Sequence, residues 1–95
     1  WSVEDAKQRL EDGWLFSVLE INDELKGWYW LDYETKEGLN LYVHKDYRGY
    51  GYGFELISYI ITAAKLQQLD SVWSQVDEWN EVSQRLFLRC GFVNE

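Results

Sequence analysis

A strand-like segment, a glycine-rich turn and a helix-like segment follow one another without a break between Leu39 and Lys65. Over residues 39–44, apolar and polar side chains alternate, which is the period of a strand with one buried face. Over residues 54–68, isoleucines and alanines recur at the spacing of an amphipathic helix. A strand that leads through a turn into a helix is typical of sheets that carry helices on their faces, so the segment predicts a mixed α/β fold.

The rest of the chain divides into elements by the same two periods. In chain order, the sequence predicts a helix over 3–12, strands over 14–21 and 25–33, the strand over 39–44, the helix over 54–68, a strand over 71–76, a helix from Asn80 to Gly91 and a further strand that begins at Phe92. The first two strands are expected to form an antiparallel hairpin. The strands on either side of the helix over 54–68 are expected to run parallel, because a helical crossover joins them.

Length and composition favour a single folded domain over residues 1–95. The chain is 46% hydrophobic and 18% aromatic, which is typical of a globular protein. No apolar run approaches the roughly 20 residues that a membrane span needs. One cysteine, Cys90, excludes an internal disulfide and fits a cytoplasmic protein. The chain begins at Trp1 and contains no methionine, so we interpret it as a fragment whose outer elements are missing at both ends.

The charge and the ligand types exclude other classes of site. A net charge of −8 disfavours nucleic acid as a partner and fits either a soluble acidic surface or a cationic partner. Zinc needs four ligands, and Cys90 with the single histidine, His44, cannot supply them. Cys90 is expected to be a buried helix residue, and His44 to have a structural or surface role.

Three glycines alternate with tyrosines in the turn: Gly49, Gly51 and Gly53. A helix that begins after such a turn presents unpaired N–H groups and the positive end of its dipole, and side chains at the glycine positions would hold an anion away from these groups. Arg48 adds a positive charge. The turn therefore predicts a phosphate or pyrophosphate site, although a tight turn without a ligand fits the pattern as well. Neither the nucleotide-hydrolase loop nor the dinucleotide fingerprint is present.

Two sequence blocks resemble the GCN5-related N-acetyltransferase (GNAT) family. The first, LYVHKDYRGYGYGFELI, is similar to the acetyl-CoA signature of that family, in which an apolar strand precedes Arg/Gln-x-x-Gly-x-Gly/Ala and a helix. The second, VDEWNEVSQRLFLRCGF, is similar to a later block of the family. Its matching positions are Val76, Asn80, Ser83, Leu86, Phe87, Gly91 and Phe92. The resemblance implies a GNAT-like acyl-CoA N-acyltransferase fold, truncated at both ends, and acetyl-CoA as co-substrate.

The resemblance also implies a binding mode for acetyl-CoA. The parallel strands splay apart, and the pantetheine arm lies in the gap like an added strand. The backbone of Tyr42 and Val43 is then expected to bond the arm, which Asn80 reaches from the opposite side, with Ser83 and Phe87 completing the cofactor set. The amides that surround the pyrophosphate are those of Arg48, Gly49, Tyr50, Gly51, Tyr52, Gly53 and Phe54.

Transfer of an acetyl group to an amine needs a carbonyl polariser, a base and a proton for the leaving thiolate. The resemblance assigns the first role to the backbone N–H of Val43. Glu37, six residues earlier, is the candidate base, and its alternative is a solvated charge in a turn. Many family members have a tyrosine where this chain has Phe87, so the proton donor stays open.

Five aromatic residues crowd the first two predicted strands: Trp14, Phe16, Trp28, Tyr29 and Trp30. They fit sheet packing, since aromatic residues are enriched in strands. They also fit a pocket for a cationic amine acceptor, whether a polyamine, an aminoglycoside, a peptide amino terminus or a lysine.

The sequence therefore predicts an acetyl-CoA-dependent N-acetyltransferase without a metal, without nucleic acid and without a membrane partner. The main alternative is a non-catalytic CoA-binding or regulatory module, for which Phe87 is the best evidence. A second alternative is an aromatic-rich interaction domain with no small ligand. A homodimer is left open.

Overall fold

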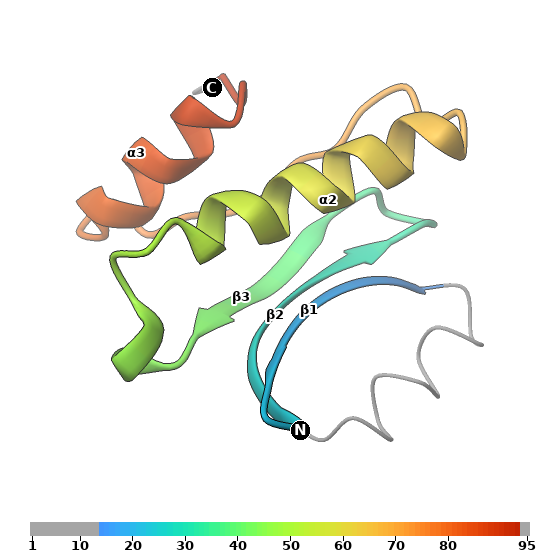
Figure 1. Cartoon of the computed structure of the whole chain (residues 1–95). Coiled ribbons are helices and arrows are strands. Elements are labelled where there is room, and N and C mark those ends of the chain that lie inside the picture. Colours follow the sequence, from blue (N-terminus) through green and yellow to red (C-terminus); the bar gives the residue numbers. More distant parts are fainter. Residues whose placement is uncertain (1–13, 94–95) are drawn as a thin grey trace.

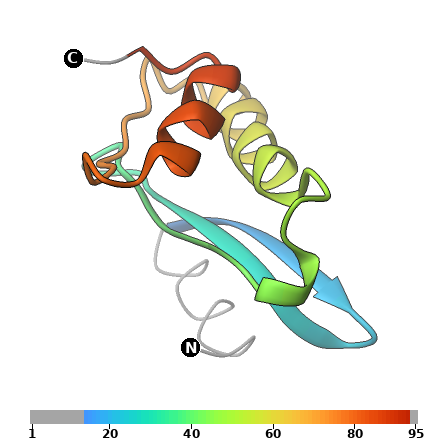
Figure 2. The ribbon, with the colours of Figure 1, turned by 90° about the vertical axis from the view of Figure 1, so that its left-hand side faces the viewer.

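The computed structural model describes residues 14–93. A three-stranded sheet in the order β1-β2-β3 consists of β1 (Trp14–Ile21), β2 (Glu24–Asp32) and β3 (Gly38–Val43). The short 3-10 helix η1 (Lys45–Tyr47) leads to α2 (Tyr52–Leu66), and α3 (Glu81–Arg89) follows. Both helices lie on the same side of the sheet (Figures 1 and 2). The fold is mixed α/β, as expected, and the helix predicted over 3–12 lies outside the described residues.

The hairpin of β1 and β2 is confirmed. The two strands pair antiparallel, with Trp14 opposite Asp32 and Ile21 opposite Glu24. Asn22 and Asp23 form the turn with φ values of 54° and 63°, and left-handed residues at both central positions match the twist of a two-residue hairpin.

The strand predicted over 71–76 is wrong in its extent. Only Trp73 pairs, in a parallel bridge with Glu37, so the predicted parallel direction is confirmed at this one position. Gly38 donates its N–H to the carbonyl of Trp73 at 2.7 Å. Beyond the bridge, the hydroxyl of Ser74 donates to the carbonyl of Gly38 at 2.6 Å, and no further backbone pair forms within the described residues.

The strand expected to begin at Phe92 is also absent from the described residues. Gly91 follows the C-cap of α3 with a φ of 97°, which ends the helical backbone. The ring of Phe92 then packs against that of Phe87, with ring centres 5.0 Å apart. A strand needs a neighbour that pairs with its backbone, and the described chain places none beside Phe92.

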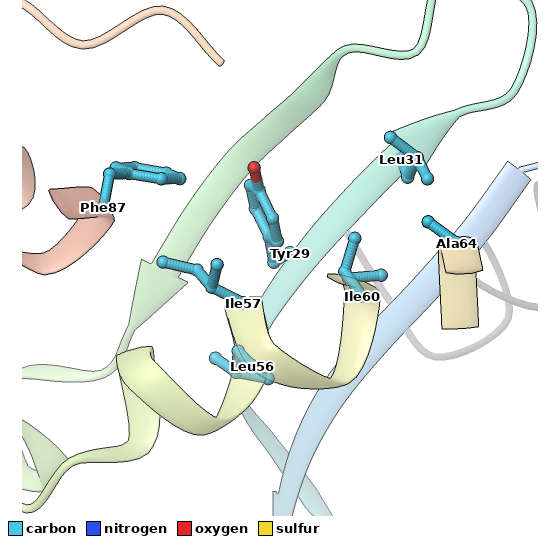
Figure 3. Packing of buried hydrophobic residues seen from close by; sticks show 7 residues of the cluster. All are labelled: Tyr29, Leu31, Leu56, Ile57, Ile60, Ala64 and Phe87. Carbon is cyan, nitrogen blue, oxygen red and sulfur yellow. The ribbon is translucent and has the colours of Figure 1, made fainter. Parts of the chain in front are cut away.

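The core forms where α2 crosses the sheet (Figure 3). It consists of Tyr29 and Leu31 from β2, Leu56, Ile57, Ile60 and Ala64 from α2, and Phe87 from α3. The helix begins at Tyr52, two residues before the predicted start, because the turn ends at Gly51. No helix within residues 14–93 is long and apolar enough to cross a membrane.

Candidate functional site

The first turn of α2 has no side-chain cap. Its N-cap residue is Gly51, with φ 86° and ψ 6°, and the first helical bond runs from the N–H of Glu55 to the carbonyl of Gly51. The N–H groups of Tyr52, Gly53 and Phe54 therefore have no acceptor within the helix. Together with the dipole of a 15-residue helix, they form a positive end suited to an anion.

The three glycines of the turn serve two different purposes. Gly49 and Gly51 have φ values of 84° and 86°, and a Cβ atom at either position would meet nothing within 4 Å. Both are therefore required by the left-handed backbone, which directs the turn into the helix. Gly53 lies inside α2, and a Cβ atom there would come 2.9 Å from Cδ2 of Leu86. Gly53 thus permits close packing of α3 on α2, a role that the sequence did not separate from anion binding.

The pairing between β2 and β3 directs the backbone of Val43 away from the sheet. His44 donates its N–H to the carbonyl of Lys26 at 2.6 Å, so this pair is a hydrogen-bonded one. Hydrogen-bonded and non-hydrogen-bonded pairs alternate along two antiparallel strands, so the next pair, Gly27–Val43, is a non-hydrogen-bonded one. The N–H and C=O of Val43 therefore point to the free edge of β3.

A bulge enlarges this free edge. Trp28 pairs with Tyr42, but Trp30 pairs with Leu39, so Asn40 and Leu41 together oppose one residue of β2. Asn40 adopts a φ of 58°. The flanking pairs are both of the hydrogen-bonded type, and the extra residue therefore lies where the ladder has no bonds.

The bulge decides which backbone groups of β3 are directed to the free edge. Tyr42 forms a hydrogen-bonded pair with Trp28, so its own N–H and C=O are directed into the sheet, whereas the predicted contact with the pantetheine arm needs them at the edge. Leu41, two residues before Val43, is directed to the edge instead. Sequence reasoning missed Leu41; the only local signal is Asn40, because asparagine tolerates the left-handed backbone better than most residues.

Arg48 links the turn to the end of β3. Its Nε donates to the carbonyl of Val43 at 2.8 Å, and its guanidinium carbon lies 5.8 Å from the centre of the Tyr42 ring. The side chain is therefore held beside the strand, rather than over the N–H groups at the start of α2. The predicted contact between Arg48 and a phosphate requires the side chain to leave this position.

The second sequence block forms α3 and its cap. Asn80 accepts the N–H of Ser83 through Oδ1 at 3.2 Å, which is a standard N-cap. Phe87 is 7% exposed and packs its ring edge-on against Tyr29 at 5.9 Å. Phe87 therefore belongs to the core, and the cap explains the Asn-x-x-Ser spacing without a ligand.

Glu37 lies at the start of β3, before the bulge. It is half-buried, its N–H donates to Oγ1 of Thr35 at 3.3 Å, and it forms the bridge with Trp73. At about 3.3 Å per residue, a regular strand would place its Cα atom roughly 13 Å from that of Leu41 and roughly 20 Å from that of Val43, and the bulge at Asn40 shortens both separations. A proton moving between the edge of β3 and the Glu37 carboxylate would therefore have to travel through water.

Two other reactive side chains have structural positions. His44 accepts the N–H of Asp46 through Nδ1 at 3.2 Å and so caps η1. Cys90 packs at the margin of the core, and burial raises the pKa of its thiol. Among the described residues, no three His, Cys, Asp or Glu side chains gather in a position to hold a metal ion.

The five aromatic residues of β1 and β2 divide between the two faces of the sheet. Tyr29 is 1% exposed in the core under α2, where its hydroxyl bonds Oγ of Ser74 at 2.8 Å, and burial raises its pKa to about 12. Trp28 and Trp30 alternate with Tyr29 and so point to the opposite face. On that face, Trp14 and Phe16 pack against Trp30, with ring centres at 5.8 and 5.4 Å.

Comparison with known proteins agrees with this geometry. A family model described as acetyltransferase (GNAT) family matches residues 1–92. A putative acetyltransferase from Agrobacterium tumefaciens str. C58 is similar in structure, with a TM-score of 0.76 and 17% sequence identity; the match covers 99% of this chain and 75% of that chain. The comparison with curated proteins gives no match.

Two further solved structures are similar. A ribosomal-protein-alanine N-acetyltransferase from Brucella melitensis has a TM-score of 0.74 and 25% identity, over 98% of this chain and 64% of that chain. A spermidine N-acetyltransferase SpeG chimera from Vibrio cholerae and hSSAT has a TM-score of 0.71 and 21% identity, over 95% of this chain and 58% of that chain. The chain spans less than two thirds of both. Because the family model covers all but the last three of its 95 residues, the chain belongs to the GNAT acetyltransferase family.

Proposed function

We propose that the chain is the acetyl-CoA-binding part of an N-acetyltransferase that transfers an acetyl group directly from acetyl-CoA to a primary amine. Membership of an acetyltransferase family supports acetyl transfer in general. The proposal adds acetyl-CoA as the donor, a cationic amine as the acceptor and the cytoplasm as the location. It leaves the oligomeric state open.

One observation carries the proposal: at both ends of the short turn between β3 and α2 lie backbone donors that have no partner within residues 14–93. The N–H groups of Leu41 and Val43 point to the free edge of β3, and the first N–H groups of α2 have no cap. Arg48 lies in the turn between them, and its Nε donates to the carbonyl of Val43. Residues fit acetyl-CoA where they offer an anion site for its pyrophosphate and a strand edge for its amide-containing arm, and this turn offers both.

In the proposed reaction, the acceptor nitrogen forms a bond to the acetyl carbon and the carbon–sulfur bond breaks. The cationic amine first releases one proton to solvent; after attack, the nitrogen loses a second proton and the thiolate of CoA gains one. An N–H at the edge of β3, from Leu41 or Val43, stabilises the charge that develops on the carbonyl oxygen. Glu37 accepts the amine proton through water. The phenyl ring of Phe87 has no proton to give, so a water molecule donates the proton to the thiolate sulfur of CoA.

A non-catalytic CoA-binding module is the second candidate function. Phe87 favours it, because a buried phenyl ring occupies the position where many family members have a tyrosine. This module would keep the anion site and the strand edge but would not release CoA.

Calorimetry with acetyl-CoA, together with a thiol-release assay over a panel of amines, tests both candidates. The proposed enzyme binds acetyl-CoA and releases CoA with at least one amine, whereas the module binds without release. Gly51→Glu is expected to abolish binding, because it places a carboxylate at the anion site. Gly51→Gln, which places a neutral side chain of the same size on the same left-handed backbone, is the matched control. Absence of acetyl-CoA binding by the unmodified protein would contradict both candidates.

A further inference from the structure

Arg89 of α3 lies against the first turn of α2. Figure 1 shows α3 beside the part of α2 that follows the glycine turn. The guanidinium carbon of Arg89 lies 5.3 Å from the centre of the Phe54 ring. Three residues earlier in α3, Leu86 faces Gly53, where its Cδ2 lies 2.9 Å from the place of a Cβ atom. Because residues three apart share one face of a helix, Arg89 belongs to the face of α3 that packs on this turn.

The ring of Phe54 holds the guanidinium near the start of α2. Aromatic side chains of a helix lean toward its N-terminus, because each Cα–Cβ bond tilts that way. A cation beside a ring is attracted by the negative face of the ring, and this contact engages none of the N–H donors of the guanidinium. The exposed side chain of Arg89 can therefore keep its place on Phe54 and donate to an anion at the same time.

Arg89 adds a positive charge that the turn itself does not direct at α2. The chain carries a net charge of −8, so a ligand with several phosphate charges needs a local positive site. Arg48 lies in the turn, but its Nε donates to the carbonyl of Val43 and its side chain is held beside β3. Arg89 approaches from α3 and lies at the first turn of α2.

Acetyl-CoA contains two kinds of phosphate, a pyrophosphate within the molecule and a phosphomonoester on the 3′-oxygen of the ribose. The proposed function places the pantetheine arm at the edge of β3 and the pyrophosphate on the first N–H groups of α2. The nucleotide end then lies beyond the turn, on the side of α2 that is away from β3. A phosphomonoester carries a charge of about −1.5 to −2 at pH 7, and its oxygens accept two parallel N–H bonds from one guanidinium.

We infer that Arg89 binds the 3′-phosphate of acetyl-CoA, so that the protein selects CoA over dephospho-CoA, the form without this phosphate. The inference rests on the proposed function and adds a residue to it. Arg89 lies within the second sequence block but at none of its matching positions. Its approach to Phe54 depends on how α3 packs on α2, which a local pattern does not predict.

Calorimetry with CoA and with dephospho-CoA tests the inference without any turnover. We expect the wild type to bind CoA about tenfold more tightly, because a two-bond pair with a doubly charged phosphate is stronger than an exposed pair of single charges. Arg89→Gln is expected to weaken CoA binding about tenfold and to leave the Kd of dephospho-CoA unchanged. Arg85→Gln removes the same charge from α3 at an exposed residue that pairs with Glu81 at 3.4 Å, and is the matched control.

The two ligands separate the inference from the proposed function. Equal affinity of the wild type for both ligands, or an unchanged ratio in Arg89→Gln, overturns the inference and leaves acetyl transfer intact. An equal loss of CoA affinity in Arg85→Gln also overturns it, because the net charge of α3 would then decide the ratio. Failure of the wild type to bind either ligand overturns the proposed function, and the inference with it.

Discussion

The Nε of Arg48 donates to the carbonyl of Val43 at 2.8 Å and thereby ties the turn before α2 to the last residue of β3. The bond uses the backbone carbonyl that the ladder leaves at the free edge, and it holds the peptide group of Val43 in one orientation. A side chain that leaves this bond to contact a phosphate would release the strand end at the same time. Cofactor binding and the order of the strand edge are therefore expected to be coupled through Arg48.

Arg48→Ala is expected to weaken acetyl-CoA binding about tenfold, because it removes both a charge and the link to Val43. Its free energy of unfolding should change by less than about 1 kcal/mol, since the bond is exposed. Calorimetry and chemical denaturation measure the two quantities. Arg48→Lys keeps the charge without the planar fork, so a loss in both variants assigns the effect to geometry. An unchanged Kd in both variants contradicts the coupling.

The different purposes of Gly51 and Gly53 predict different costs of substitution. Gly51→Ala forces a side chain into a left-handed backbone and should lower the free energy of unfolding by about 1–2 kcal/mol. Gly53→Ala gains helix propensity of roughly 1 kcal/mol and loses a similar amount against Cδ2 of Leu86, so its net effect should stay within about 1 kcal/mol. Urea denaturation of both variants measures these changes.

Relief of the contact provides the control. In the Leu86→Ala background, Gly53→Ala should become stabilising, because the helix keeps the propensity gain and the contact is gone. Equal losses for Gly51→Ala and Gly53→Ala would show that both glycines serve the same purpose.

The sequence predicts the elements whose residues interact along the chain. The alternation over 39–44, the helical period after the turn and the Asn80 cap are local patterns, and β3, α2 and α3 form where these patterns predict them. The division of Trp28, Tyr29 and Trp30 between two faces also follows from alternation, although the aromatic cluster as a whole does not reveal it.

The errors arise where distant residues decide the structure. The strand predicted over 71–76 does not continue after Trp73, because pairing there depends on β3. That strand bulges at Asn40, and the hydroxyl of Ser74 donates to the carbonyl of Gly38. Because of the same bulge, the backbone N–H of Leu41, and not that of Tyr42, is directed to the free edge of β3. A single asparagine in a strand-like segment does not predict a bulge, since its left-handed φ of 58° forms only in the paired sheet.

Tyr29 predicts a loss of stability in alkali. Its pKa is raised from 10.0 to about 12, chiefly by burial, so the phenol ionises in the unfolded chain before it ionises in the folded protein. Its contribution is complete below about pH 10 and is lost as the pH rises to about 12, at about 1.4 kcal/mol per pH unit. Denaturation of the wild type and Tyr29→Phe between pH 8 and about 12 measures the difference.

The variant removes the ionisable group and keeps the ring in the core. It should be less stable than the wild type by about 1 kcal/mol at pH 8, because the bond to Ser74 is lost. This difference should shrink and then reverse as the pH approaches about 12. A difference that stays constant over this range would mean that the Tyr29 hydroxyl titrates as if it were exposed.

Glu37 provides the last prediction, because its place at the start of β3 separates two roles that the sequence leaves open. If its carboxylate accepts the amine proton through water, Glu37→Gln lowers kcat by about 10²-fold or more and removes the acidic limb of the pH–rate profile. The bridge to Trp73 uses backbone atoms only, so the variant should keep its free energy of unfolding. Glu34→Gln, an exposed residue of the same turn, is the matched control. An unchanged pH–rate profile in Glu37→Gln would return this residue to the role of a solvated charge, and the proton would then pass directly to water at the edge of β3.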